Sequence, residues 1–288
     1  MSRRSAGRAP ACGASALLTW VKDARRPASY SAAKVSPKAG AGRRAPGTPE
    51  PSMPSPFPAQ PEALRAVRRE FDATRFADRR AAGRALALAL QDLRTADDLL
   101  VLGLARGGVP VAYEVARALG AELDVMVVRK LGVPRQPELA MGAIGAGGVL
   151  ELNLEVIADA GVGQEQLQQV LLREREELQR REQAYRGHMP PPRLHARTVV
   201  LVDDGIATGA SMRAALSVLR RAGPARLVVA TPVAPDGTAQ ALGLPPHDLV
   251  ALLQPRNFAG VGSFYQDFGQ TSDEEVRSLL ALSRTAAT

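Results

Sequence analysis

The chain has 288 residues, 45% of them hydrophobic, which is ordinary for a globular protein with one large or two small domains. Its formal net charge is +8, and the whole excess lies in residues 1–57, where ten Lys or Arg face only Asp23 and Glu50. Residues 58–288 hold twenty-seven basic and twenty-seven acidic residues. A folded part without net charge gives no electrostatic reason to expect a nucleic-acid partner, and we expect none.

Residues 1–57 are predicted to form a disordered basic tail, and residues 58–288 the folded domain. The tail is rich in Ala, Arg, Pro, Ser and Gly, so it cannot bury enough apolar surface to offset the entropy of ordering. Two alternatives stay open. A weakly apolar stretch at 11–20 follows two arginines, as in a secretion signal, and Met53 is a second candidate for the first residue.

The sequence offers neither a membrane span nor a cysteine framework. No run approaches the roughly eighteen apolar residues that a membrane-spanning helix needs. The single cysteine, Cys12, lies in the tail, so neither a disulfide nor a cysteine metal site can be built from it. We therefore expect a cytoplasmic protein with no membrane partner.

The first half of the domain is predicted to contain one strand-loop-helix unit, a second strand and a long loop. Hydrophobic periodicity and turn residues predict helices at 62–70 and 75–93, a buried strand at 99–104, a glycine loop at 106–108 and a helix at 109–119. An apolar strand follows at 124–128. Because residues 131–149 are rich in Gly and Pro, we expect a long mobile loop there, with one short strand near 142–144.

The second half alternates strands with helices. A long charged helix is predicted at 164–186, followed by strands at 198–202, 226–232 and 248–253, helices at 210–222 and after Asp236, and a last helix from Ser272. Interleaved acids and bases indicate a solvated face on the long helix. The alternation predicts an α/β fold with a doubly wound, mostly parallel sheet. In such sheets ligands bind beyond the carboxyl ends of the strands, where the loops at 105–108, 129–149, 203–211 and 232–238 lie.

Residues 199–211 read VVLVDDGIATGAS, a buried strand that runs into two acids and then a loop of small residues. A glycine-rich loop before a helix offers free N–H groups and the positive end of the helix dipole to a phosphate. Asp203 and Asp204 add groups that accept hydrogen bonds from hydroxyls or organise a metal. The alternative is a plain turn in which Thr208 or Ser211 only caps the helix.

This motif resembles the signature of type I phosphoribosyltransferases, and the resemblance extends over most of residues 71–283, to an uncharacterised bacterial branch of the family. It implies the type I phosphoribosyltransferase fold, with a long inserted helix and a small hood, and a homodimer. It also implies a Mg²⁺-dependent reaction in which 5-phosphoribosyl 1-pyrophosphate meets a small-molecule acceptor. No Walker-type or dinucleotide-binding loop fits the same residues.

The resemblance assigns the donor-binding residues by position. Asp203 and Asp204 would accept hydrogen bonds from the ribose hydroxyls, close to Mg²⁺. The 5-phosphate would bind the loop formed by Ala207, Thr208, Gly209, Ala210 and Ser211. The pyrophosphate would bind the ARGG loop formed by Ala105, Arg106, Gly107 and Gly108, which in the family often carries a non-proline cis peptide. The alternative for ARGG is a simple glycine turn between strand and helix.

Two further segments are assigned in the same way. RKLGVP resembles a segment of adenine phosphoribosyltransferases, so Arg129 and Lys130 are candidates for the leaving pyrophosphate, unless they are a solvated strand end. Glu138, in the loop expected to close over the site, is the candidate general acid or base. Ala207 stands where 6-oxopurine enzymes carry an Asp, which argues against a 6-oxopurine acceptor.

The C-terminal segment FAGVGSFYQDFGQTSDEEV resembles the part of purine enzymes that frames the base. Phe258 or Tyr265 would stack on a base and Asp267 would bind its edge, although an aromatic cluster that only packs the fold is an equal alternative. The leading functional hypothesis is phosphoribosyl transfer to an unidentified nucleobase or amine, within nucleotide metabolism. The second hypothesis is a non-catalytic sensor of the donor or of a nucleotide, and a third is hydrolysis or phosphorolysis of a sugar phosphate.

Overall fold

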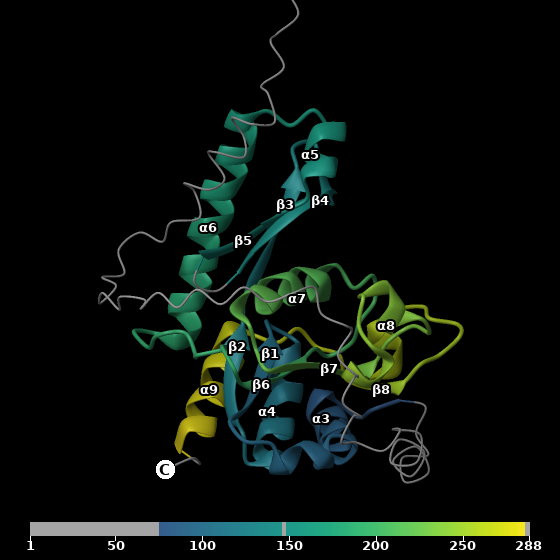
Figure 1. Cartoon of the computed structure of the whole chain (residues 1–288). Coiled ribbons are helices and arrows are strands. Elements are labelled where there is room, and N and C mark those ends of the chain that lie inside the picture. The colour runs from purple at the N-terminus through teal and green to yellow at the C-terminus, as the bar shows by residue number, and fades with distance from the viewer. Residues whose placement is uncertain (1–74, 146–147, 286–288) are drawn as a thin grey trace, which may run out of the picture.

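The computed structural model describes residues 75–145 and 148–285 (Figure 1). The predicted tail and the predicted helix at 62–70 lie outside these residues. Within them, no helix combines the length and the apolar character that crossing a bilayer requires.

Five parallel strands form the central sheet, in the order β2-β1-β6-β7-β8. Their bounds are β1 (Leu99–Leu104), β2 (Glu122–Met126), β6 (Thr198–Val202), β7 (Arg226–Val233) and β8 (Leu249–Leu253). Successive side chains of a strand point to opposite faces of the sheet, so each continuous apolar run supplies core residues to both faces. Val101 and Val200 belong to the core on one face, and Leu100 and Leu201 to the core on the other. The predicted parallel α/β sheet is confirmed.

Helices cover both faces of this sheet, as Figure 1 shows. The helices α3 (Arg79–Ala89), α4 (Gly108–Leu119) and α9 (Asp273–Thr285) lie on one face, and α7 (Ala210–Ala222) lies on the other. The short helix α8 (Thr238–Ala241) follows β7. The helix predicted at 75–93 is shorter: Asp78 caps α3 by accepting a 2.7 Å hydrogen bond from the Ala81 N–H, and a 3₁₀ helix at Gln91–Thr95 replaces its end.

A second unit, the arm (residues 128–186), stands over α7 in Figure 1. It contains the antiparallel strands β3 (Val128–Val133), β4 (Gln136–Gly145) and β5 (Val149–Leu152), then α5 (Leu154–Asp159) and α6 (Gln164–Arg186). The strands pack on α7, and α6 contacts β3 and α9. The long helix α6 has the predicted bounds. At its end, buried Arg186 donates to the Asp124 carboxylate of β2 at 3.0 Å.

The predicted long loop at 131–149 is wrong, because its glycines serve close packing within a sheet. A Cβ at Gly142 would overlap the carbonyl oxygen of Glu151 on the neighbouring strand. A Cβ at Gly145 would lie 2.8 Å from the side chain of Val218 on α7. The bend between β3 and β4 uses Arg135, which has a positive φ of 71°. Small residues here let the arm lie against α7.

Candidate active site

The topology brings the two sequence motifs to one place. Counted within the central sheet alone, the strand order is 2-1-3-4-5, and in such sheets ligands bind where the order reverses, between strands 1 and 3. Here these strands are β1 and β6, which pair in parallel register. The ARGG loop follows β1 and the acid pair follows β6. Residues about a hundred positions apart therefore meet at one edge of the sheet.

The ARGG loop touches the acid pair so closely that only glycine fits. A Cβ at Gly107 would lie 2.7 Å from the Asp204 Cγ, and a Cβ at Gly108 would lie 2.9 Å from the Asp203 Cα. The peptide between Ala105 and Arg106 is cis, as the resemblance implies for this loop. The two glycines are thus required for the approach of one loop to the other, which goes beyond the needs of a simple turn.

The two acids lie in different electrostatic surroundings. The Asp203 carboxylate accepts a 2.9 Å hydrogen bond from the Asp204 N–H, and burial together with the Asp204 charge raises the pKa of Asp203 well above 3.8. The Asp204 carboxylate instead accepts a 2.7 Å hydrogen bond from the Arg79 Nε. Both residues are half-buried. The Asp204 carboxylate is therefore held by a cation, while the Asp203 carboxylate is hydrogen-bonded to Asp204 itself.

The small-residue loop leads into the N-terminus of α7. Ala207 and Thr208 are exposed, Gly209 has a φ of 71°, and the Thr208 hydroxyl accepts a 3.4 Å hydrogen bond from the Ala210 N–H. Ala210 and Ser211 begin a helix of 13 residues, whose first N–H groups have no intrahelical acceptor. The loop thus presents backbone donors and two hydroxyls at the positive end of a helix dipole.

Arg213 is a cation near this loop that the sequence motif does not reveal. It is exposed, and its Nη1 lies 3.2 Å from the position that a Cβ at Gly209 would take. One turn into α7, it adds positive charge beside the first turn of the helix. Arg213 lies three positions after Ala210, beyond the motif, and a single arginine on a helix does not by itself indicate a binding site. The motif alone therefore does not identify it.

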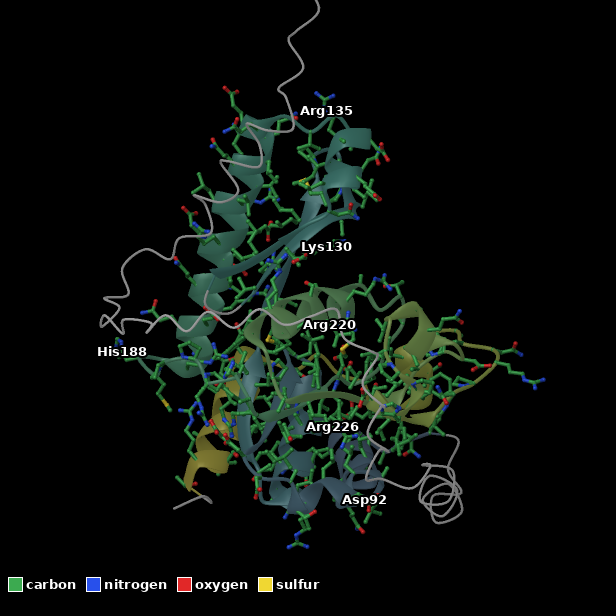
Figure 2. All side chains as sticks on the ribbon, viewed as in Figure 1. Asp92, Lys130, Arg135, His188, Arg220 and Arg226 are labelled. Carbon is green, nitrogen blue, oxygen red and sulfur yellow. The ribbon has the colours of Figure 1, made fainter. Side chains whose placement is uncertain are left out.

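Arg129 and Lys130 line one cavity between β3 and α6, but they differ in their other neighbours. Both lie on β3, where neighbouring side chains point to opposite faces. The Arg129 guanidinium pairs with Glu174 of α6 at 2.7 Å. Lys130, labelled in Figure 2, lines a cavity of about 760 Å³ between the arm and α7, together with Ala210 and Arg213. Of the two predicted pyrophosphate ligands, Lys130 is the one that shares a cavity with the start of α7.

Arg106 and Glu138 are placed by other elements. The Arg106 guanidinium lies 3.6 Å from the carboxylate of Asp273 at the start of α9, and the same carboxylate accepts a 2.8 Å hydrogen bond from the Tyr185 hydroxyl. Glu138 lies in strand β4, not in a loop as predicted, because residues 136–145 pair with β3. Its side chain lies outside the described part of the structure.

The C-terminal segment (residues 258–271) packs against the site, and its aromatic side chains fit the alternative of an aromatic cluster that packs the fold. Tyr265 is buried and its hydroxyl donates a 2.6 Å hydrogen bond to the Asp204 carbonyl, so its ring supports the acid pair and offers no free face to a base. Burial and the Asp204 charge raise the pKa of Tyr265 above its ordinary value. Asp267 is exposed and accepts from the Gly269 N–H at 3.0 Å. Phe258 stacks on Phe264 at 5.7 Å.

Arg79 is a site residue that no sequence motif indicates. Besides its bond to Asp204, its Nη1 donates to the Gly269 carbonyl at 2.6 Å. Its guanidinium lies 4.0 Å from the centre of the Phe268 ring. An arginine in the first turn of a helix that begins Arg-Arg is typical of a solvated face, and only the tertiary fold directs it to the acids.

Comparison with known proteins agrees with this arrangement. Residues 75–242, more than half of the chain, match the family model described as "Phosphoribosyl transferase domain". Two curated Mycobacterium tuberculosis proteins, Rv0571c and MT0597, each named "Putative phosphoribosyl transferase", are 46% identical over 205 residues. The match covers 71% of this chain and 46% of each relative, so the chain spans about half the length of the curated relatives it matches.

A solved structure shares the fold at similar identity. The crystal structure of TT1426 from Thermus thermophilus is 48% identical, with a TM-score of 0.64, and the match covers 72% of this chain and 97% of that one. Together with the acid pair, the glycine loops and the parallel sheet, these matches show that the chain belongs to the phosphoribosyl transferase domain family.

Proposed function

We propose that the protein transfers a phosphoribosyl group from 5-phosphoribosyl 1-pyrophosphate to a nitrogenous acceptor, a nucleobase or an amine, and releases pyrophosphate. The observation that carries this proposal is the meeting of the ARGG loop and the Asp203-Asp204 pair at the β1/β6 edge. There, two carboxylates that can accept hydrogen bonds from hydroxyls contact the ARGG loop, and the loop at the start of α7 follows them in the chain. Ribose hydroxyls between two phosphate groups are the matching chemical pattern.

Each group of residues has a distinct part in the proposed reaction. The acid pair accepts hydrogen bonds from the ribose hydroxyls and fixes the ring. The loop from Ala207 to Ser211 binds the 5-phosphate through N–H groups at the start of α7, where the helix dipole favours an anion. Orientation of this kind lowers the barrier because the reacting centre is held in place before bond breaking begins.

The leaving group requires positive charge. As pyrophosphate departs from C1 of the ribose, negative charge grows on it, and the backbone amides of the ARGG loop and the Lys130 ammonium stabilise that charge. Arg106 is held toward α9 by Asp273 and Arg129 toward α6 by Glu174. The nitrogen of the acceptor forms the new bond to C1 as the bond to pyrophosphate breaks, and the proton that this nitrogen loses passes to water or to the departing pyrophosphate.

The residues of the site fit Mg²⁺. This ion prefers oxygen ligands and is usually held by one or two carboxylates together with substrate phosphates and waters. Asp203 and Asp204 supply such oxygens at the edge where the donor phosphates would lie. The described residues contain no cluster of three or more His, Cys, Asp or Glu side chains. When bound, the ion would offset the charge of the departing pyrophosphate.

A binding and turnover assay tests the proposal. The full chain is incubated with the donor, Mg²⁺ and a panel of nucleobases and amines, and pyrophosphate release is followed. Asp203→Asn and Asp204→Asn should each weaken donor binding at least tenfold, whereas Asp159→Asn, an exposed residue of α5, should bind as the wild type does. If both active-site variants bind the donor as tightly as the wild type, the assigned site is wrong.

The same assay distinguishes the alternative function. Tight donor binding that depends on Asp203 and Asp204 without turnover of any acceptor would favour a non-catalytic sensor of the donor or a nucleotide. The homodimer and the cytoplasmic location remain predictions, and the dimer is checked by the molar mass of the full chain in light scattering. Pyrophosphate release with one acceptor above all others would identify the acceptor class.

A further inference from the structure

Arg79 lies in the first turn of α3 and connects the acid pair to the C-terminal segment. Its side chain is only 13% exposed, although it carries a full charge. The Nε donates to Asp204 Oδ2 at 2.7 Å and Nη1 donates to the Gly269 carbonyl at 2.6 Å. The guanidinium also stacks on Phe268 at 4.0 Å. A buried guanidinium with a charged, a neutral and an aromatic partner holds all three in fixed relative positions.

Backbone bonds join the same two parts of the chain. The Phe76 N–H donates to the Phe264 carbonyl at 2.8 Å, and the Gln266 N–H donates back to the Phe76 carbonyl at 2.8 Å. The Asp267 N–H donates to the Ala77 carbonyl at 2.9 Å. These hydrogen bonds join the residues just before α3 to residues 264–267. Arg79 at the start of α3 and Tyr265 within the second segment both reach Asp204.

The neighbouring arginine shows that this arrangement is specific. Arg80 also pairs with a buried acid, Glu114 of α4, at 2.8 Å, but its side chain is 49% exposed. Glu114 has two further arginine partners, Arg84 and Arg117, so loss of Arg80 leaves that acid paired. Asp204, in contrast, has Arg79 as its one cationic partner within 4.0 Å among the described residues. Loss of Arg79 would therefore leave its acid without a cationic partner in the described part of the chain, whereas loss of Arg80 would not.

We propose that Arg79 is a positioning residue that fixes the Asp204 carboxylate for the ribose and couples it to the C-terminal segment. This inference rests on the proposed donor site. Arg79 Nε occupies one oxygen of Asp204, which leaves Oδ1 to accept from a ribose hydroxyl. Because the same guanidinium holds Gly269 and Phe268, donor binding at Asp204 and ordering of residues 264–271 stabilise each other.

Donor affinity and hydrogen exchange test the coupling in the full chain. Calorimetric titration with 5-phosphoribosyl 1-pyrophosphate and Mg²⁺ should show a dissociation constant raised about tenfold or more in Arg79→Met, partly restored in Arg79→Lys, and within twofold of wild type in Arg80→Met. In wild type and Arg80→Met, the donor should slow amide exchange in peptides covering residues 262–271. In Arg79→Met that protection should disappear.

A second variant keeps the test decisive if Arg79→Met fails to fold. Phe268→Ala removes the aromatic partner of Arg79 and leaves the pair with Asp204 in place, so donor protection of residues 262–271 should fall to less than half. If Phe268→Ala keeps wild-type protection of residues 262–271, or if a folded Arg79→Met keeps wild-type affinity and protection, the coupling is refuted. If the wild type itself binds no donor, the proposed function fails and the inference fails with it.

Discussion

Gly107 lies directly against the carboxylate of Asp204, so that a Cβ at position 107 would lie 2.7 Å from the Asp204 Cγ. This contact joins the loop after β1 to the loop after β6. On one side of the contact is the backbone of Gly107, and on the other is the Asp204 carboxylate, which Arg79 holds. Any movement of this carboxylate would also disturb its 2.7 Å bond to Arg79, whose side chain is itself mostly buried.

Gly107→Ala should therefore weaken donor binding at least tenfold, because the methyl group pushes the Asp204 carboxylate or the ARGG loop out of place. Overpacking of this kind costs about 1–3 kcal/mol of folding free energy. Gly163→Ala is the matched control, since a Cβ there would meet its nearest atom at an ordinary 3.8 Å. Titration calorimetry and thermal unfolding of both variants check the prediction, and unchanged affinity in Gly107→Ala would contradict it.

Lys130→Ala should change ligand affinity, whereas Arg129→Ala should change stability. Lys130→Ala should raise the dissociation constants of the donor and of inorganic pyrophosphate, because this side chain shares a cavity with the start of α7. Arg129→Ala should leave those constants within about threefold and lower stability by about 1–3 kcal/mol, because buried Glu174 loses one of its two arginine partners. Equal loss of pyrophosphate affinity in both variants would show that the two side chains act together on the leaving group.

Tyr265→Phe should destabilise the fold more than its small change in volume suggests. It leaves the Asp204 carbonyl without the 2.6 Å hydrogen bond from the tyrosine hydroxyl, at a cost of about 1–3 kcal/mol if no water replaces it. Tyr113→Phe is the control, because the half-buried Tyr113 only lies under the Arg80 guanidinium. Urea unfolding of both variants measures the difference, and equal stabilities would mean that the carbonyl needs no partner.

The central sheet and the acid pair could be predicted because local pattern decides them. Apolar runs such as Val199–Val202 have few alternatives to a buried parallel strand, and the loops after such strands must meet at one edge. The arm could not be predicted, because Gly142 and Gly145 are residues that usually indicate a turn or a flexible loop. In the fold they permit contacts with Glu151 and Val218, which only the tertiary structure specifies.

Site residues within short motifs could be predicted, whereas those that act through long-range contacts could not. Asp203, Asp204 and the two glycine loops belong to short motifs whose residue types have few other uses. Arg79 and Tyr265 act through long-range contacts, 125 and 61 residues from Asp204, and each residue type is common on helices or in aromatic clusters. Sequence pattern therefore located the two loops that we propose bind the donor, but not Arg79 and Tyr265, which contact the acid pair between them.

Tyr185 should make stability depend on pH in the alkaline range. Tyr185 is buried and its hydroxyl donates to Asp273 at 2.8 Å, and burial together with this bond raises the pKa of Tyr185 to about 12. An unfolded chain releases the tyrosine proton at about pH 10. Between about pH 10 and 12 the folded state thus binds more protons than the unfolded state, so the free energy of unfolding falls as the pH rises.

Tyr185→Phe should remove the part of this slope that Tyr185 contributes. Below pH 10 the wild type should be more stable than the variant by about 1 kcal/mol, the usual net worth of such a hydrogen bond, and the difference should shrink as the pH rises toward 12. Urea unfolding of both proteins at several values between pH 8 and 11 measures the difference, in which the titration of other groups cancels. A difference that stays constant with pH would show that Tyr185 has the same pKa in both states, and that its bond to Asp273 does not hold the proton.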